Sequence, residues 1–370
     1  MRVFFIGISL LLVSCATTHE PIELTAELRE KWVKDTKTRI NHIQKLALVS
    51  SKILTEGKRY CENHDHIGPY IGINTLSNQI FEKHWHELAL SEFSLSEETQ
   101  ILFVNPSSPA DSAGLKVGDI VYEVNRQSIK SMAHFEKLIK ETVVIEDPIT
   151  FTIRREGEYR DVSVIPSIAC KSQVKYLDDN HVSFTWEEPD LNIVIYKGVM
   201  ENFESDEEIA MAVSHQLAHN ARQHWKANDV YGYMTGAGLG LLGFVGDFAN
   251  ALITGGSSYE ESYMMGGWKD GRMIGNSISV EQELQADYDA LHLMVIAGYE
   301  IENASRFWSK YEEKAVPRIM SSSSKYETIA KKEPIPSKYL HPIIKDRSVK
   351  IEVMINEIKE KTRSNSSLIP

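Results

Sequence analysis

Two histidines, four residues apart, constrain this chain more than any other feature of its sequence. His215 and His219 stand on either side of a Gln-Leu-Ala triplet. On an α-helix such residues lie on one face, a single turn apart, so both imidazoles can reach the same metal ion. Ser205 and Glu208 predict a capping box that starts this helix, and apolar residues at helical spacing follow it. The alternative is a core helix with two incidental histidines.

A second helix can supply a third ligand. Ser279 and Gln282 predict another capping box, and Gly298 predicts the end of that helix. Glu283 and Asp287 are four residues apart and therefore share a face. Glu283 can complete a His-His-Glu site with one position open, the catalytic rather than the structural arrangement. Asp287 can accept the other N–H of a histidine ligand and fix its tautomer. The alternative is a solvated acidic face.

Together these residues resemble the gluzincin metallopeptidases typified by the CAAX prenyl protease and the bacterial heat-shock protease HtpX. The family pattern is His-Glu-x-x-His followed by Glu-x-x-x-Asp, and the resemblance covers roughly residues 167–359. It implies an α+β fold whose zincin metallopeptidase domain is mostly helical with a small edge sheet. It also implies Zn²⁺ as the cofactor, with His215, His219 and Glu283 as ligands and Asp287 behind them.

The resemblance implies roles for residues outside the two helices. The segment Ile193, Val194, Ile195 and Tyr196 is similar to the family's edge strand, which precedes the zinc helix and holds the substrate backbone. His341 and Arg347 are similar to the histidine and arginine of the family's late His-Pro motif. In the family these two side chains face the tetrahedral intermediate, so here they are expected to stabilise its oxyanion.

Gln216 departs from the family pattern at the position of the general base. The family has a glutamate there, which takes a proton from the attacking water. Glutamine has nearly the same shape but no useful basicity, so the chain is expected to have impaired activity. Three interpretations stay open: a zinc metalloendopeptidase that acts weakly on envelope proteins, a non-catalytic zinc-binding pseudoprotease serving as chaperone or adaptor, and a substitution introduced to trap substrate.

The N-terminus is typical of an exported protein. Arg2 precedes an apolar run, residues 3–13, which is too short to span a membrane and has the length of a signal-peptide core. The Leu-Val-Ser-Cys stretch ending at Cys15 resembles a bacterial lipobox, so residues 1–14 would be removed and Cys15 lipidated. Ala16 resembles the sorting pattern of Gram-negative outer-membrane lipoproteins, which predicts a protein facing the periplasm. An ordinary secretory signal or an uncleaved anchor is the alternative.

Two cysteines remain in the exported chain. Cys61 and Cys170 bracket the middle of the sequence, and disulfides persist in an oxidising compartment. A bridge between them would tie the entrance of this segment to its exit. The alternative is a pair of buried free thiols.

The segment between the cysteines resembles a bacterial PDZ domain over roughly residues 67–166. The elements that carry the resemblance are a strand at 101–104, a short helix at 110–113 stopped by Gly114, a helix around Phe135, and a closing strand at 149–153. PDZ domains add an extended peptide to a sheet edge and hold its carboxylate with backbone N–H groups. Tyr70, Ile71, Gly72 and Ile73 are therefore expected to bind peptide. The alternative is a structural spacer.

These features predict the domain organisation and the partners. The expected segments are a signal peptide 1–14, an N-terminal helical segment 15–60, a β-rich PDZ domain 61–166, a metallopeptidase domain 167–360 with a Gly-rich insertion 231–278, and a disordered tail 361–370. The insertion is expected to be a flexible lid or membrane-touching loop rather than a membrane span. A net charge of −12 argues against nucleic acid, so the expected partners are polypeptides and, through the lipid, the membrane.

Overall fold

The computed structural model describes residues 24–180, 184–187, 192–203, 205–224, 280–311, 313 and 346–363. Several features predicted from sequence lie outside this part of the chain. They include the signal peptide, the lipidated Cys15, the Gly-rich insertion at 231–278, Ser279 of the second capping box, His341, and residues 364–370 of the tail.

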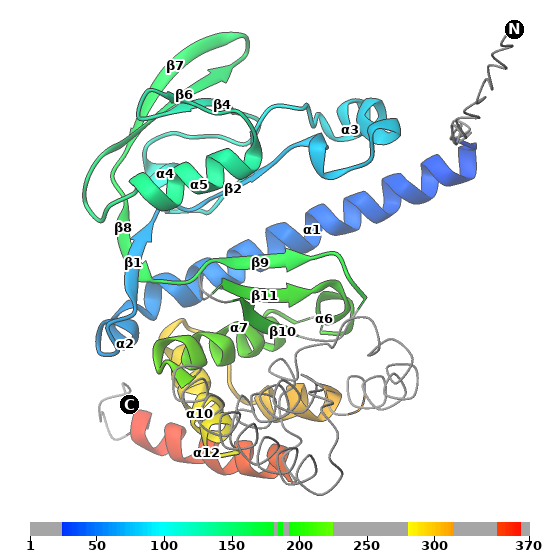
Figure 1. Ribbon diagram of the computed structural model, residues 1–370. Coiled ribbons are helices and arrows are strands. Elements are labelled where there is room, and N and C mark those ends of the chain that lie inside the picture. The colour runs from blue at the N-terminus through cyan, green and yellow to red at the C-terminus, as the bar shows by residue number, and fades with distance from the viewer. Residues whose placement is uncertain are drawn as a thin grey trace, which may run out of the picture.

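A long helix, α1 (Ala26–Glu56), runs through the molecule between the PDZ region and the helices of the metallopeptidase region (Figure 1). The side chain of Thr25 caps it by accepting a hydrogen bond from the Leu28 N–H. The short helix α2 (Lys58–Glu62) follows directly after Gly57. None of the described helices has the length and apolar composition that crossing a bilayer requires.

The PDZ region is built on a six-stranded sheet in the order β2-β3-β4-β6-β7, with β5 paired to β4. Its strands are β2 (Ile73–Leu76), β3 (Gln100–Val104), β4 (Ile120–Val124), β5 (Gln127–Ser128), β6 (Ile149–Arg155) and β7 (Glu158–Val164). Alternate residues of β6 are buried, as its apolar alternation predicts. Helices α4 (Pro109–Ser112) and α5 (Met132–Thr142) pack on the sheet, and Phe135 and Leu138 of α5 enter the core. Strand β2 stands at the sheet edge.

An insertion between β2 and β3 attaches the PDZ region to α1. It contains the 3₁₀ turns η1 (Asn78–Ile80) and η2 (Lys83–Trp85) and the helix α3 (His86–Phe93). Trp32 of α1 stacks on Trp85 with ring centroids 4.9 Å apart, and its ring also meets the edges of Phe81 and Phe93. Aromatic contacts of this kind add to the apolar burial, so the PDZ region is held against the first half of α1.

Two short strands and a disulfide tie the entrance of the PDZ region to its exit. Strands β1 (Ile67–Tyr70) and β8 (Ser167–Cys170) pair antiparallel. The predicted disulfide between Cys61 and Cys170 is formed, with 5.4 Å between the two Cα atoms. The PDZ region therefore leaves and rejoins the rest of the chain at one place.

The metallopeptidase region combines a small sheet with helices. Its elements are β9 (Val174–Leu177), β10 (Phe184–Glu187), β11 (Asn192–Tyr196), α6 (Lys197–Asn202), α7 (Asp206–Ala221), α10 (Val280–Ile296) and α12 (Arg347–Arg363), and residues 304–311 are also helical. The sheet order is β10-β11-β9. With the PDZ region this confirms the predicted α+β fold class. Helix α12 includes residues 361–363, which the sequence had placed in a disordered tail.

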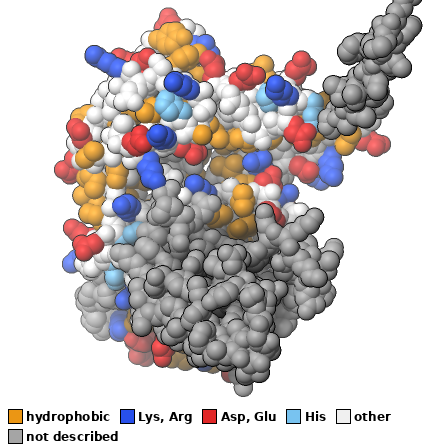
Figure 2. Space-filling model, in the orientation of Figure 1, with side chains coloured by type: hydrophobic (Ala, Val, Ile, Leu, Met, Phe, Trp, Pro, Cys, Tyr) orange, Lys and Arg blue, Asp and Glu red, His pale blue; other side chains and the backbone are white. Residues whose placement is uncertain are grey.

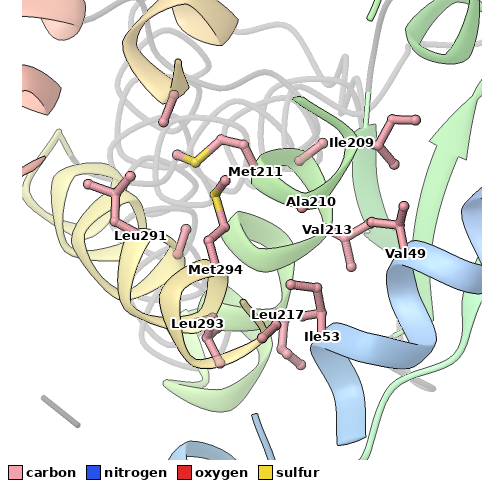
Figure 3. Close-up of a cluster of buried hydrophobic side chains, with 14 of the residues drawn as sticks. Val49, Ile53, Ile209, Ala210, Met211, Val213, Leu217, Leu291, Leu293 and Met294 are labelled. Carbon is pink, nitrogen blue, oxygen red and sulfur yellow. The ribbon is translucent and has the colours of Figure 1, made fainter. Parts of the chain in front are cut away.

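Helix α1 belongs to the core of the metallopeptidase region. Figure 3 shows Val49 and Ile53 of α1 packed toward Leu217 of α7 and toward Leu293 and Met294 of α10. Each of these side chains is buried. Burying a large apolar side chain contributes about 1.5–3 kcal/mol, so α1 is an integral part of this core.

The disulfide generates a stability prediction. Replacing both Cys61 and Cys170 by alanine should lower the free energy of unfolding by about 4–5 kcal/mol in the chain-entropy model, because the bridge spans 109 residues. Urea unfolding would measure the loss, with the wild-type protein in reductant as the matched control. An unchanged unfolding midpoint, or peptide mapping that finds both thiols free after periplasmic expression, would contradict the bridge.

Candidate metal centre

Helix α7 carries the two histidines, and a capping box fixes where this helix begins. The Ser205 hydroxyl accepts from the Glu208 N–H at 3.2 Å, and the Glu208 carboxylate accepts from the Ser205 N–H at 3.4 Å, which is the predicted capping box. His215 and His219 follow on the face turned toward α10. Both rings are essentially inaccessible to solvent.

Three side chains meet in the spacing of a tetrahedral metal site. The Nε2 atoms of His215 and His219 are 3.1 Å apart. The Glu283 carboxylate lies 3.3 Å from His215 Nε2 and 3.4 Å from His219 Nε2. A zinc ion with bonds of about 2.0–2.2 Å places its ligand atoms about 3.3 Å apart, so the donor set fits Zn²⁺.

Asp287 contacts His215 on the side of the ring opposite the other metal ligands. Its Oδ1 is 3.0 Å from Nδ1 of His215, whose Nε2 faces the other ligands. An N–H at Nδ1 that donates to this carboxylate leaves Nε2 with a lone pair for the metal. Burial alone lowers the pKa of His215, but hydrogen bonds and charge from Asp287 and Glu283 outweigh it. The pKa of His215 in the metal-free chain is therefore raised.

A third histidine, which the sequence reasoning missed, holds the second ligand. Nδ1 of His224 lies 2.9 Å from Nδ1 of His219. One of these nitrogens must donate and the other accept, so a His219 that binds metal through Nε2 donates from Nδ1 to a neutral His224. Burial, with the nearby Arg222, lowers the pKa of His224 to about 4 and keeps it neutral. The signal was its position five residues after His219, just beyond the end of α7.

Arg347 lies at the metal centre, against two carboxylates of α10. Its Nε and Nη2 donate to Asp287 at 2.8 Å, and Nη2 also donates to Glu283 at 2.9 Å. The guanidinium is 2% exposed and lies over the ring of Trp308. Two buried carboxylates need a cation, since an isolated buried charge costs several kcal/mol. Arg347 therefore positions Glu283 and Asp287, and its contact with an oxyanion stays a prediction.

The strand expected to hold the substrate backbone is not an edge. Residues 193–196 lie in β11, which pairs with β10 on one side and with β9 on the other. Both backbone edges of β11 are therefore occupied. Within the described residues, β9 and β10 are the outer strands of this sheet. Gln216, the position of the general base, is fully buried beside the ligand histidines on α7.

The four predicted peptide-binding residues line one groove. Tyr70, Ile71, Gly72 and Ile73 border a cavity of about 420 Å³ that also touches Phe135 and Ile139 of α5. Strand β2 is at the sheet edge, so the groove lies where an added strand would pair.

Two buried aspartates of α10 allow a matched test of the metal centre. Asp287→Asn should weaken zinc binding about 10–100-fold, because the amide supports the His215 tautomer poorly. Asp289 is equally buried on the same helix, but it accepts from Tyr60 at 2.7 Å and from Arg222, away from the ligands. Asp289→Asn should therefore lower stability without changing zinc affinity. Chelator competition measures both variants, and equal zinc affinities for the two would refute the role of Asp287.

Comparisons with known proteins agree with this geometry. The model of the family "Peptidase family M48" matches residues 171–355, which is half of the chain, and that of "PDZ domain" matches residues 69–165. The first match contains every residue of the His-His-Glu cluster. Members of this family depend on zinc, so Zn²⁺ is the cofactor that the donor set holds.

Similarity to individual proteins is confined to parts of the chain. Zinc metalloprotease RasP of Oceanobacillus iheyensis is 32% identical over 73 residues, 20% of this chain and 17% of that protein. Probable protease eep of Enterococcus faecalis is 30% identical over 115 residues, 31% of this chain and 26% of that protein. The chain thus spans at most about a quarter of these curated relatives.

Among solved structures, similarity is found to the HtrA3 PDZ domain bound to a phage-derived ligand, at 21% identity and a TM-score of 0.22 over 28% of this chain and 88% of that one. The HtrA-type protease AlgW with a decapeptide is 19% identical, with a TM-score of 0.22 over 28% of this chain and 30% of that one. The match over residues 171–355 and the buried His-His-Glu cluster inside it show that the chain belongs to peptidase family M48.

Proposed function

We propose that this chain is a membrane-anchored periplasmic protein of zinc-endopeptidase lineage that acts in cell-envelope protein quality control or processing. Its PDZ domain would capture peptide segments, and Gln216 would suppress hydrolysis. The observation that carries the proposal is the fully buried His215, His219 and Glu283 cluster with a glutamine at the base position. The second candidate, favoured by the same glutamine, is a non-catalytic zinc-binding chaperone or adaptor.

The residues around the metal centre have different roles. A zinc ion held by the three ligands supplies Lewis-acid polarisation of a carbonyl and a lowered pKa for water. Asp287 and His224 keep the two histidines in the tautomer that leaves Nε2 free for the metal. Arg347 offsets the negative charge of Glu283 and Asp287 within the buried site.

Because position 216 is glutamine, the site lacks the carboxylate that usually transfers the proton. A glutamate at this position would accept a proton as water attacks the peptide carbonyl and return it to the leaving amine. The amide of glutamine can orient a water by hydrogen bonding, but it cannot take up that proton. A substrate should therefore bind and persist rather than be cut.

The loop before β2 supports peptide capture. The carbonyls of Ile71 and Gly72 accept from the N–H groups of Ala110 and Asn105 at 3.0 and 2.8 Å. Within the described residues the N–H groups of Ile71 and Gly72 themselves have no acceptor. Gly72 has φ +90°, and a Cβ there would meet the Cβ of Ser108 at 2.3 Å, so only glycine fits. Free N–H groups next to an edge strand suit a peptide carboxylate.

The location rests on the N-terminal sequence. A lipid on Cys15 would hold the protein at the outer membrane, facing the periplasm. The disulfide between Cys61 and Cys170 supports an oxidising compartment. Envelope polypeptides would then be the substrates or clients.

The metal content of the purified protein tests the site directly. We expect about one Zn²⁺ per molecule, because the three ligands form a single tetrahedral site. One position of that site stays open. His215→Ala and His219→Ala should each abolish stoichiometric zinc, as measured by elemental analysis. An unchanged zinc content in both variants would show that the metal lies elsewhere.

Substitution of Gln216 tests whether this position controls peptide hydrolysis. Gln216→Glu should raise peptide hydrolysis about 10²–10⁴-fold, the usual contribution of a positioned general base. The measurement is a time course on an unfolded envelope protein with both versions, each checked for zinc. Gln216→Ala serves as the control that removes the side chain without adding a carboxylate.

The two candidate functions separate in this experiment. Restored cleavage by Gln216→Glu supports the endopeptidase lineage. No cleavage by either version, with zinc bound, supports the chaperone or adaptor. Equal cleavage by both versions would show that the base is another residue.

A further inference from the structure

Trp308 contacts two different parts of the metal centre. Its side chain is 1% exposed and belongs to the helix at 304–311, which carries none of the three metal ligands. The edge of its ring meets the ring of His215, with the centroids 5.0 Å apart. The guanidinium of Arg347 lies over its face, with Cζ 3.2 Å from the ring centroid. One side chain therefore touches both a metal ligand and the arginine that balances the carboxylates.

The burial of Arg347 makes its contact with Trp308 important. Figure 2 shows Lys and Arg side chains on the surface of the PDZ region, among acidic ones, where water solvates them. The side chain of Arg347, in contrast, is 2% exposed. A buried guanidinium loses that solvation, and the negative face of an aromatic ring attracts it more strongly where water is excluded. Arg347 is therefore held both by its hydrogen bonds to the carboxylates and by the ring of Trp308.

Arg347 distinguishes the two carboxylate oxygens of Glu283. Oε2 accepts a hydrogen bond from Arg347 Nη2 at 2.9 Å and lies 3.3 Å from His215 Nε2. Oε1 lies 3.4 Å from His219 Nε2. A carboxylate that binds zinc through one oxygen keeps a position of the tetrahedral site open, whereas binding through both oxygens occupies that position. Because Arg347 bonds to Oε2, its placement favours binding of zinc through Oε1 alone.

The helix that carries Trp308 is fixed to the rest of the metallopeptidase region. Lys310 Nζ donates to the carboxylate of Glu208, a residue of the α7 capping box, at 2.5 Å. Phe307 packs on Phe203, with the ring centroids 4.7 Å apart, and both rings are fully buried. These contacts hold the helix against α7 and the end of α6, so the Trp308 ring keeps its place.

We propose that Trp308 is a positioning residue of the metal centre. Its ring holds Arg347 against Glu283 and packs on His215, so that Glu283 offers zinc a single oxygen and one position stays open. Trp308 acts through these residues and does not itself touch the reacting atoms. The inference rests on the metal centre of the proposed function. It adds a group that the spacing of histidines and carboxylates on α7 and α10 does not indicate.

The test compares the full-length wild-type protein with Trp308→Met, Trp308→Phe and Phe203→Met. Methionine fills apolar space but has no ring face, and phenylalanine keeps a smaller one. Phe203 is equally buried and packs on Phe307, so its substitution reports the loss of a buried ring as such. Chelator competition measures zinc affinity. The visible absorption of the Co²⁺-loaded protein measures coordination, because its intensity falls as the coordination number rises from four to five. The melting temperature shows that each variant is folded.

Trp308→Met should lower zinc affinity about 10-fold, the lower end of the effect of groups that orient metal ligands. It should also weaken the Co²⁺ absorption, because Glu283 then binds through both oxygens. Trp308→Phe should lower zinc affinity only about two- to threefold, because a phenyl ring attracts a cation less than an indole does. Phe203→Met should lower the melting temperature and leave zinc affinity and the Co²⁺ spectrum unchanged.

Wild-type zinc affinity together with an unchanged Co²⁺ spectrum in Trp308→Met would overturn the proposal. Equal losses of affinity in Trp308→Met and Phe203→Met would do so as well, because the cause would then be general loosening of the core. If Trp308→Met does not fold, Trp308→Phe decides, and wild-type affinity in that variant would overturn the proposal. In all these outcomes the wild-type protein binds zinc and the metal centre stands. If the wild type binds neither Zn²⁺ nor Co²⁺, the metal centre of the proposed function fails, and the role of Trp308 fails with it.

Discussion

The structure depends on the burial of two carboxylates. Glu283 and Asp287 have no solvent exposure, and each would cost several kcal/mol if left alone in the interior. Arg347 and His215 face them at 2.8–3.3 Å, and zinc would add further positive charge. This requirement draws three helices together that are far apart in sequence: α7 brings the histidines, α10 the carboxylates and α12 the arginine. The metal centre and the packing of these helices are therefore one arrangement.

Helix α1 extends this arrangement to the PDZ region. Its second half is buried against α7 and α10, while its first half is held by the aromatic contacts around Trp32. The disulfide and the β1–β8 pair close the two connections between the regions. Because one rigid helix contacts both, the peptide groove and the metal centre keep a defined relation, and a flexible tether is not needed to join them.

The proposed function depends on which groups of the metal centre are present and on the one position that departs from the family pattern. Among the described residues the His-His-Glu cluster, the groups that orient it and a charge-balancing arginine are in place, and position 216, where the family resemblance places a glutamate base, has glutamine. In the proposed function, Gln216 separates two properties: the protein binds metal and peptide, but it lacks the group that transfers the proton.

The sequence by itself determined the features that depend on local spacing. The pairs His215–His219 and Glu283–Asp287 followed from helical periodicity, the start of α7 from its capping box, and the PDZ strands from apolar alternation. Gln216 as the departure from the family pattern is also a fact of sequence alone. The bridge between Cys61 and Cys170 followed from the number of cysteines and from the export that the N-terminal sequence predicts.

Only the tertiary structure decided the relations between distant segments. It placed β11 between two strands rather than at an edge, turned Arg347 toward the carboxylates, and brought His224 to His219. It also put α1 in the metallopeptidase core. The physical reason is that strand order, charge pairing and groove walls are set by which surfaces meet in space. Periodicity along the chain shows which face of a helix or strand is apolar. It does not show which other segment packs against that face.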